Sequence, residues 1–239
     1  MKVLSFDVGI KNLAYCIIEV INPKEIEHKI IEWGVIDCTD NLISNLKCCV
    51  VRKGKTCNKT AINKVIVNDK TLGFCDLKTC QKELNGTYTK KDIKKAKIMK
   101  TKDLSLDQIG TEIYRSFNNL PFLLEIDIIS IENQPVLKNP TMKSIQMLIF
   151  SYFLLNKLEK NKDYEIKLFN ARKKLKIYDG PKIVINVKND YKKRKLLSIK
   201  YTEYFLNKYN NNYNDFFNAN LKKDDLADSY LQGLTYIYK

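Results

Sequence analysis

Residues 1–20, MKVLSFDVGIKNLAYCIIEV, decide the fold of this chain. An apolar run at 3–8 is typical of a buried strand, Gly9 permits a tight turn, and a second β-rich run at 13–21 returns. Asp7 interrupts the first run, where an ionised carboxylate is costly unless a partner compensates its charge. The stretch predicts an Asp held against a sheet to bind a metal ion. A strand-end Asp that caps a turn is the alternative.

Three further acidic residues occupy comparable positions later in the chain. Glu132 ends the β-branched run 126–132, and open α/β sheets place their sites at the carboxyl ends of strands. Asp225 and Asp228 are three residues apart in the last expected helix, so both carboxylates project from one face. Helix N-termini favour carboxylates by themselves, which accounts for Asp224 better than for Asp228.

Apolar periodicity and turn signals divide most of the chain into strands and helices. Ser105 and Gln108 form a capping box that begins a helix. Strands are expected at 2–8, 13–21, 30–37, 126–132 and 164–169, and helices at 105–118, 141–160, 190–209 and one that carries 222–228. The first three strands have short connections and are expected to form an antiparallel meander. The order of elements predicts an α/β fold in which acids from two neighbouring strands face a pair on a packed helix.

The charge of the chain points to a polyanionic partner. Lys and Arg number 42 against 27 Asp and Glu, a net charge of +15 in 239 residues. Nucleic acid is the first expectation, an anionic membrane surface the second, and a generally basic proteome the alternative. No run approaches the ~18 apolar residues of a membrane span, and the N-terminus enters a strand without a signal peptide. We therefore expect an intracellular protein with no membrane partner.

The cysteines predict a separate metal module. Residues 41–103 read as a Lys-rich insertion that holds five of the seven cysteines: Cys48, Cys49, Cys57, Cys75 and Cys80. Their spacing forms two pairs separated by a hairpin-length segment, as in zinc ribbons. Four thiolates fill a tetrahedral site and leave no open position, so the zinc would be structural. Free thiols are the alternative, and Cys16 and Cys38 are expected to be core thiols.

The carboxylates are suited to a different metal. Because His28 is the only histidine, a His-based triad and a multi-His centre are nearly excluded, and metal chemistry must use carboxylates or cysteines. Hard oxygen ligands favour Mg²⁺ or Mn²⁺, and two such ions can polarise a phosphodiester and activate water. The Lys-rich stretch 88–102 is either a solvated linker or an arm that follows DNA.

Three motifs carry a family resemblance. In the order FDVGIKNLAY, IENQP and KKDDLADSYLQ, the chain resembles the RuvC-like Holliday junction resolvases of the RNase H-like superfamily, most closely those of poxviruses and other large DNA viruses. The resemblance covers most of the chain outside 41–103. It implies an RNase H-like α/β fold, a mixed five-stranded sheet flanked by helices, formed by 1–40 and 104–239. The inserted segment 41–103 resembles the small zinc module of some large-virus members.

The resemblance also implies roles for particular residues. The four motif acids, expected to bind two Mg²⁺ or Mn²⁺ ions, are Asp7, Glu132, Asp225 and Asp228. Asp224 is an extra acid beside the motif. The family's catalytic lysine falls in ARKKLK, where Lys174 is the first choice and Lys176 the second. The expected zinc ligands are Cys49, Cys57, Cys75 and Cys80, with Cys48 as the alternative first ligand.

We therefore expect a metal-dependent endonuclease that resolves four-way DNA junctions, with no small-molecule substrate, in the cytoplasm or nucleus of an infected host. One set of acids per chain predicts a homodimer. Its seam is expected on helix 141–160, through Ile145, Leu148, Ile149, Tyr152 and Leu155.

Three alternatives remain open at this point. One is another RNase H-like nuclease that acts on different branched or single-stranded nucleic acid, although a full-length RuvC-like effector would be far longer. A second is a non-catalytic, zinc-containing nucleic-acid-binding protein, against which the complete set of acids argues. A third is a sugar-kinase-like ATPase, which needs Gly-rich phosphate loops that a chain with 8 Gly lacks.

Overall fold

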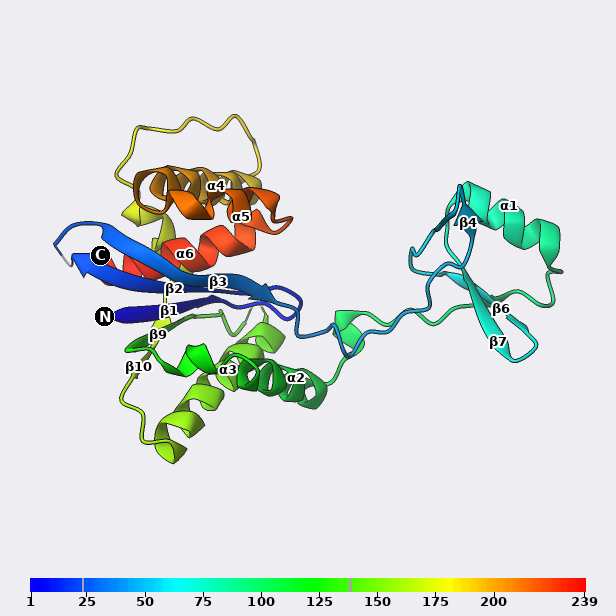
Figure 1. The fold of residues 1–239 in the computed structure, drawn as a ribbon, viewed down its shortest axis with the longest axis horizontal. Helices are drawn as coiled ribbons and strands as arrows, with labels where there is room; N and C mark the ends of the chain where they lie inside the picture. The colour runs from blue at the N-terminus through cyan, green and yellow to red at the C-terminus, as the bar shows by residue number, and fades with distance from the viewer. Residues whose placement is uncertain (23, 138) are drawn as a thin grey trace. The chain divides into compact units, whose positions relative to one another are not determined.

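The computed structural model describes residues 1–22, 24–137 and 139–239, which divide into two compact units (Figure 1). Unit 1 comprises Met1–Thr39 and Ser105–Lys239, and unit 2 comprises Asp40–Leu104. The sequence placed the insertion at 41–103. Within the described ranges, no helix combines the length and the apolar character needed to cross a bilayer.

Unit 1 is built on a five-stranded mixed sheet, as the sequence predicted. Its strand order is β10-β9-β1-β2-β3. The antiparallel meander comprises β1 (Lys2–Asp7), β2 (Leu13–Asn22) and β3 (Glu27–Ile36). The strands β9 (Ile128–Glu132) and β10 (Glu165–Phe169) continue the sheet in parallel on the other side of β1. The first strand is therefore central, and its carboxyl end lies beside that of β9.

Helices cover both faces of this sheet (Figure 1). One face packs against α2 (Leu106–Asn118) and α3 (Pro140–Glu159), and the other against α4 (Asp190–Tyr209), α5 (Asn214–Ala219) and α6 (Lys223–Tyr238). The predicted capping box of α2 is present, because Ser105 Oγ accepts from Gln108 N while Gln108 Oε1 accepts from Ser105 N. The 3-10 turns of unit 1 are η2 (Pro121–Leu124), η3 (Ala171–Ile177) and η4 (Asn211–Tyr213).

Side-chain alternation along β1 determines which helix each residue meets. The Phe6 ring lies 5.4 Å from that of Phe117 and 5.7 Å from that of Phe153, between centroids, on the α2–α3 face. Ser5 points the other way and donates to the carbonyl of Ser229 on α6. Since residues two apart share a face, Asp7 points to the α6 side with Ser5.

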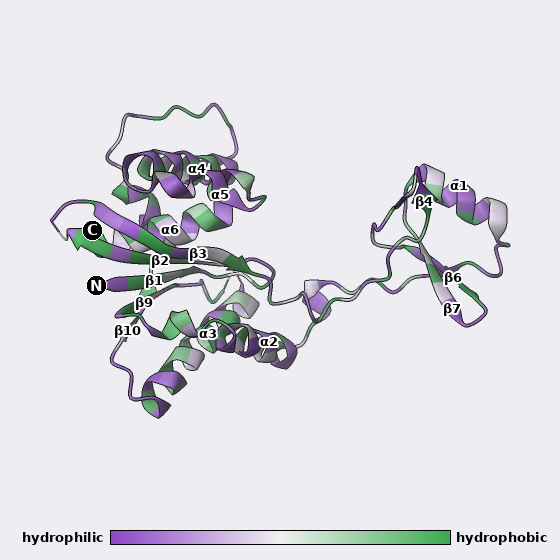
Figure 2. Ribbon diagram, viewed as in Figure 1, coloured by the Kyte–Doolittle hydropathy of each residue, from purple (hydrophilic) through white to green (hydrophobic). Residues whose placement is uncertain are grey.

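The last helix packs unusually close to the sheet. A Cβ added to Gly233 would lie 2.8 Å from Ile18 Cδ1 and 2.9 Å from Ser5 Oγ, so only glycine fits there without displacement. Gln232 is buried beside it and donates to the carbonyls of Phe6 and Ser130, on neighbouring strands. These contacts hold α6 over the paired strands β1 and β9. Figure 2 shows hydrophobic residues along the central strands and α3, whereas α4 is mostly hydrophilic.

Unit 2 has its own small core. It contains the two-stranded pair β4 (Val51–Arg52) and β5 (Lys55–Thr56), the three-stranded sheet β7-β6-β8, the helix α1 (Lys78–Thr87) and the 3-10 turn η1 (Thr101–Asp103). The strands of that sheet are β6 (Asn63–Val67), β7 (Lys70–Phe74) and β8 (Lys94–Lys95). The β6–β7 hairpin turns through Asn68 and Asp69, both with positive φ, as a type I′ turn requires. The Lys-rich stretch 88–102 thus includes a paired strand, which the sequence did not predict.

The expected dimer seam on α3 is partly wrong. Ile145, Ile149 and Tyr152 are buried within unit 1, so they cover the sheet and are not available to a partner. Leu155 is 46% exposed. The large apolar side chains of α3 that do face solvent are Met147, Leu154, Leu155 and Leu158. Their spacing places them on one side of the helix, and we call them the α3 stripe.

The single histidine belongs to a buried polar cluster. His28 Nε2 lies 2.7 Å from Tyr230 Oη and 3.1 Å from Asn210 Nδ2, whose amide oxygen accepts from Ile30 N. Because the Asn210 nitrogen is a donor, Nε2 is an acceptor and the imidazole is neutral. Burial lowers the pKa of His28 from 6.5 to about 4.

This cluster predicts acid sensitivity of folding. Between pH 6.5 and about 4 the unfolded chain protonates His28 and the folded chain does not, so the free energy of unfolding falls as the pH falls through this window. Over this window His28 lowers the free energy of unfolding by roughly 3 kcal/mol. Urea unfolding at pH 7 and pH 4 should show a larger loss for the wild type than for His28→Gln. Equal losses in the two proteins would contradict the prediction.

Candidate active site and metal centre

A cavity of 730 Å³ in unit 1 gathers the four acids that were expected to bind metal ions. The predicted residues that line it are Asp7, Glu132, Lys174, Asp225 and Asp228. Two come from strand ends, one from η3 and two from the first turns of α6. Residues separated by more than 200 positions in the chain therefore meet at the carboxyl ends of β1 and β9.

The parallel register explains why the two strand acids meet. Phe6 pairs with Ile131, so the following residues, Asp7 and Glu132, stand side by side at the end of the pair. Gln134, two residues further on, donates from Nε2 to Glu132 Oε2 at 2.7 Å. Gln146 on α3 in turn accepts from Gln134 N at 2.7 Å. Glu132 is thus held by Gln134, which Gln146 of α3 holds in turn.

Lys174 stands in the middle of the acids. Its Nζ lies 2.6 Å from Asp228 Oδ2, 3.5 Å from Asp7 Oδ1 and 3.9 Å from Glu132 Oε1. All four side chains are less than 20% exposed. Lys176, the second choice from the sequence, lines a different cavity, so the structure brings Lys174 and not Lys176 to the acids.

Burial and charge oppose each other at this cluster. Burial raises the pKa of Asp7 well above its usual value, as do the neighbouring charges of Glu132 and Asp228, while Lys174 lowers it. Burial lowers the pKa of Lys174, but the three surrounding carboxylates outweigh burial and raise it above the ordinary value. The lysine therefore stays charged, and the carboxylates still carry excess negative charge for another cation.

The acids at the start of α6 divide into two kinds. Asp225 lines the cavity, and burial followed by the charge of Asp224 raises its pKa. Asp224 forms an ion pair with Lys195 of α4, which outweighs burial and lowers its pKa. The extra acid of the motif thus ties α6 to α4, whereas its neighbour faces the cavity.

Several cavity residues were not singled out from the sequence. They are Gln134, Asn139, Arg172, Tyr191, Arg194 and Lys195. The glutamine is part of the IENQP motif, and its position two residues after Glu132 in an extended segment was a usable signal. The basic residues belong to Lys/Arg-rich stretches, in which no spacing distinguishes a residue that faces a site from one that faces solvent.

The donor set fits a divalent cation. Asp228 Oδ1 is buried and has no hydrogen-bond partner among the described residues, although Oδ2 of the same carboxylate contacts Lys174. A buried, unpaired carboxylate oxygen is costly unless a cation or donor satisfies it. Four carboxylates against one lysine also leave net negative charge, and carboxylate oxygens are ligands that Mg²⁺ and Mn²⁺ prefer.

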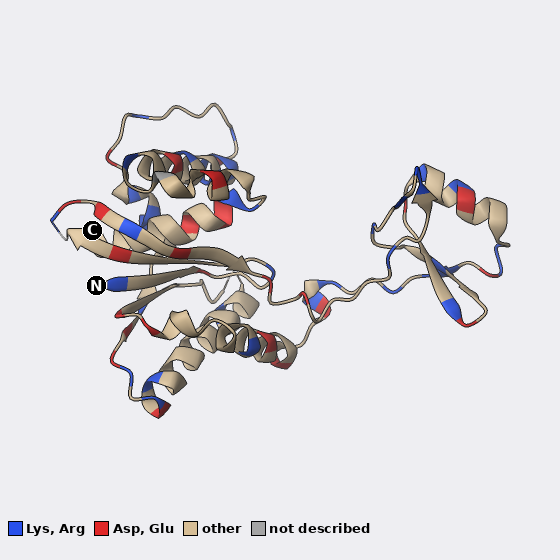
Figure 3. Cartoon of the chain, viewed as in Figure 1, with Lys and Arg blue, Asp and Glu red and all other residues tan. Residues whose placement is uncertain are grey.

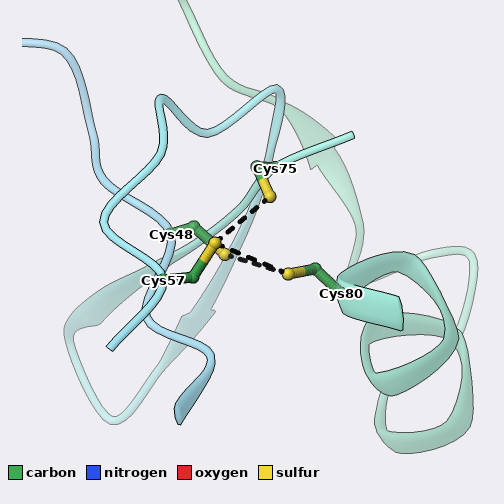
Figure 4. Close-up of side chains that lie close together, drawn as sticks. All are labelled: Cys48, Cys57, Cys75 and Cys80. Atoms are coloured by element: carbon green, nitrogen blue, oxygen red, sulfur yellow. Dashed lines mark hydrogen bonds between the residues drawn. The ribbon is translucent and has the colours of Figure 1, made fainter. Parts of the chain in front are cut away.

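Four of the five cysteines of unit 2 form a second metal-type group (Figure 4). The sulfurs of Cys48, Cys57, Cys75 and Cys80 all lie within 4.8 Å of one another. Three of the separations are 3.6 Å (Cys48–Cys80), 3.7 Å (Cys57–Cys75) and 3.9 Å (Cys57–Cys80). Sulfurs about 2.3 Å from a tetrahedral zinc lie about 3.8 Å apart, so the group has the size of a zinc site.

The structure corrects the choice of Cys49 as first ligand. Cys48 is fully buried and joins the other three sulfurs, whereas Cys49 is half-buried and lies outside the group. Neighbouring residues in extended backbone point to opposite sides, so one of the two must turn away. The sulfur of Cys80 comes from α1. Arg52 Nη2 lies 2.8 Å from this sulfur.

The two remaining cysteines have no part in this group. Cys16 and Cys38 are fully buried in unit 1, as expected of core thiols. Burial raises the pKa of Cys38 to about 12 and that of Cys16 well above its usual value. Neither thiol is ionised near neutral pH, so neither is suited to nucleophilic chemistry.

The mixed sheet and its strand-end acids define an α/β protein with the fold of a Holliday junction resolvase. The yeast mitochondrial Holliday junction resolvase Ydc2 is similar with a TM-score of 0.53 and 14% identity, over 99% of this chain and 78% of the resolvase. The fowlpox virus resolvase, solved with Holliday junction DNA, has a TM-score of 0.49 and 17% identity, over 99% and 97% of the two chains.

The sequence comparisons give a viral relative without an assigned activity. An uncharacterised protein of Acanthamoeba polyphaga mimivirus is 28% identical over an alignment of 322 positions. The alignment covers 99% of this chain and 74% of that protein. No family model matches the chain.

The cysteine group predicts about one zinc per chain in protein purified without added metal, because four thiolates complete one tetrahedral site. Elemental analysis should find that Cys48→Ser loses the zinc and Cys49→Ser retains it. The neighbouring substitution is a matched control for the loss of a thiol. Wild-type protein without zinc, or loss of zinc in Cys49→Ser alone, would contradict the prediction.

Proposed function

We propose that this protein is a metal-dependent endonuclease that resolves four-way DNA junctions. The observation that supports it best is the group of four carboxylates around Lys174 at the carboxyl ends of β1 and β9. The fold shared with Ydc2, a Holliday junction resolvase, favours this class of nuclease over other nucleic-acid enzymes. The mimivirus relative supports an origin in a large DNA virus.

In this proposal the carboxylates of Asp7, Glu132, Asp225 and Asp228 hold two Mg²⁺ ions, or Mn²⁺. When bound, the ions would polarise the phosphodiester and supply an activated water. Lys174 keeps its positive charge and stabilises the negative charge that develops on the phosphate oxygens.

Basic side chains of the same cavity would position the DNA backbone. Arg172 and Arg194 line the cavity with the acids, and their guanidinium groups can bind phosphate oxygens in a bidentate manner. Tyr191 is 60% exposed, and Lys195 lies 5.1 Å from its ring centroid. The cavity thus combines metal-type ligands with phosphate-type donors, as hydrolysis of a polyanion requires.

Removing one acid should abolish cleavage without loss of folding. Asp7→Asn or Asp228→Asn is expected to eliminate cutting of a four-way junction while junction affinity stays within a few-fold. Because burial makes the ionised form of Asp7 costly, the Tm of Asp7→Asn should be unchanged or higher. Cleavage gels, junction-binding titrations and thermal unfolding measure these outcomes.

Two neighbouring residues provide matched controls. Asp224→Asn should keep most of the cleavage, because Asp224 pairs with Lys195, whereas Asp225→Asn should lose it. In the same way Lys174→Met should lose cleavage and Lys176→Met should retain it. Substantial cutting by Asp7→Asn or Asp228→Asn would refute the assignment.

We also propose that the protein acts as a symmetric homodimer. A four-way junction has near two-fold symmetry and needs paired nicks, while each chain carries one set of acids. The α3 stripe is the surface that we assign to the partner copy. Leu158 is 71% exposed and Leu154 40%, on the same side of the helix. Pairing two such stripes would remove these apolar groups from water.

Mixing wild-type chains with Asp7→Asn chains should give heterodimers that nick one strand without resolving the junction. The double substitution Leu154→Lys, Leu158→Lys should shift sedimentation towards monomer and lower paired cutting, because charges then meet across the two-fold axis. A protein that sediments as a monomer, both free and on the junction, would be evidence against the dimer.

A further inference from the structure

The positive charge of the chain is concentrated in unit 2. Residues 40–104 contain 16 Lys and Arg against six Asp and Glu, a net charge of +10 (Figure 3). Unit 1 holds the other 26 basic and 21 acidic residues, a net charge of +5. A zinc ion with four thiolates would subtract two charges from unit 2 and leave it the more basic unit. The smaller unit therefore carries most of the attraction for a polyanion.

The basic side chains of unit 2 are not neutralised within the protein. Over residues 40–104, all of which the structure describes, no side-chain nitrogen of Lys or Arg lies within 4.0 Å of a carboxylate oxygen. In unit 1 the corresponding ion pairs include Arg115–Glu112, Lys195–Asp224 and Lys200–Glu203. Arg52 is engaged by a sulfur of the cysteine group. The lysines of unit 2 are thus available to an external anion.

The three-stranded sheet presents lysines on its solvent face. Val65 is buried on β6 in the cysteine core, so Lys64, beside it, points away from that core. Lys94 of β8 pairs directly with Lys64 across the ladder and shares its face. Like charges directly opposite each other destabilise a sheet, and an anion that binds between them removes the repulsion.

A second basic turn lies in the same unit. Lys53 and Gly54 form the turn between β4 and β5 with φ of 46° and 73°, and Lys55 follows them. Both lysines are exposed. Unit 2 therefore presents cations from both of its sheets.

The aromatic content of unit 2 limits what it can recognise. Its two aromatic residues, Phe74 and Tyr88, pack against each other with ring centroids 5.9 Å apart. Phe74 is buried and Tyr88 packs partly buried against the cysteine core, so unit 2 has no set of exposed rings on which successive bases could stack. Lysines without aromatic partners suit the phosphate backbone of a duplex, contacted without base sequence preference.

We propose that unit 2 is the module that binds duplex DNA, through phosphate contacts of the face that carries Lys64 and Lys94. This inference deepens the proposed function, and it rests on that function for the choice of DNA as the polyanion. It assigns most of the affinity for DNA to unit 2, while Arg172 and Arg194 of unit 1 position the DNA backbone at the acids.

The test uses the full-length protein without added divalent ions, so that no cutting occurs. Wild type, Lys64→Gln/Lys94→Gln and the control Lys24→Gln/Lys29→Gln are titrated with labelled 20-bp duplexes of two unrelated sequences over a range of salt. The control removes equal charge from exposed positions of unit 1 near the β2–β3 turn, at the opposite end of the sheet from Asp7. Zinc content and circular dichroism verify folding, and Lys53→Gln/Lys55→Gln is the second variant of unit 2.

We expect Lys64→Gln/Lys94→Gln to bind on the order of tenfold more weakly at ~0.1 M salt, with the salt slope reduced by about 1.8, for both sequences alike. The control should change affinity less than about twofold, since its lysines contact no phosphate. Wild-type affinity in both unit 2 variants would overturn the inference, even if the protein resolves junctions. The inference would also be overturned if the two unit 2 variants bound vesicles of anionic lipid more weakly but bound DNA as the wild type does. Failure of cleavage alone, with the expected binding results, would refute only the proposed nuclease.

Discussion

The site depends on one buried electrostatic arrangement, a lysine ammonium surrounded by three carboxylates. Asp7 alone in the central strand would be costly to ionise, and Lys174 offsets part of that cost. The arrangement exists only because α6 lies close enough to the sheet to bring Asp228 within 2.6 Å of the lysine, which the lack of a side chain at Gly233 permits. The remaining negative charge, and the unpaired Asp228 Oδ1, make the same site suited to divalent cations.

The sequence predicts the central sheet well, because its strands are short apolar runs bounded by turn residues, and Asp7 and Glu132 stand at the ends of two of them. The choice between Lys174 and Lys176 lies in a 3-10 turn, whose register no periodicity reveals. The choice between Cys48 and Cys49 depends likewise on which way an extended segment faces. The expected seam on α3 was wrong at three buried residues, because periodicity measures the width of an apolar face and not how much of it the sheet covers. Ile145 and Tyr152 are covered, and Leu158 is not.

The two units divide the electrostatic tasks. Unit 1 gathers four carboxylates around Lys174 at the cavity and forms ion pairs such as Lys195–Asp224, whereas unit 2 leaves its lysines without ion pairs around a small cysteine core. Metal ligands and polyanion contacts oppose each other electrostatically, so a cluster of acids would repel the phosphates that a cluster of lysines attracts. Arg172 and Arg194 line the cavity beside the acids, but the larger excess of positive charge belongs to unit 2.

The central claim is that the acids around Lys174 cut branched DNA. Cleavage of synthetic four-way, forked and linear duplex DNA by wild-type protein with and without Mg²⁺ tests it most directly. The account predicts Mg²⁺-dependent, paired nicks in opposing strands of the four-way junction and little cutting of the linear duplex. Cutting of all three substrates at equal rates, cutting that does not need a divalent ion, or no cutting of any substrate would contradict it.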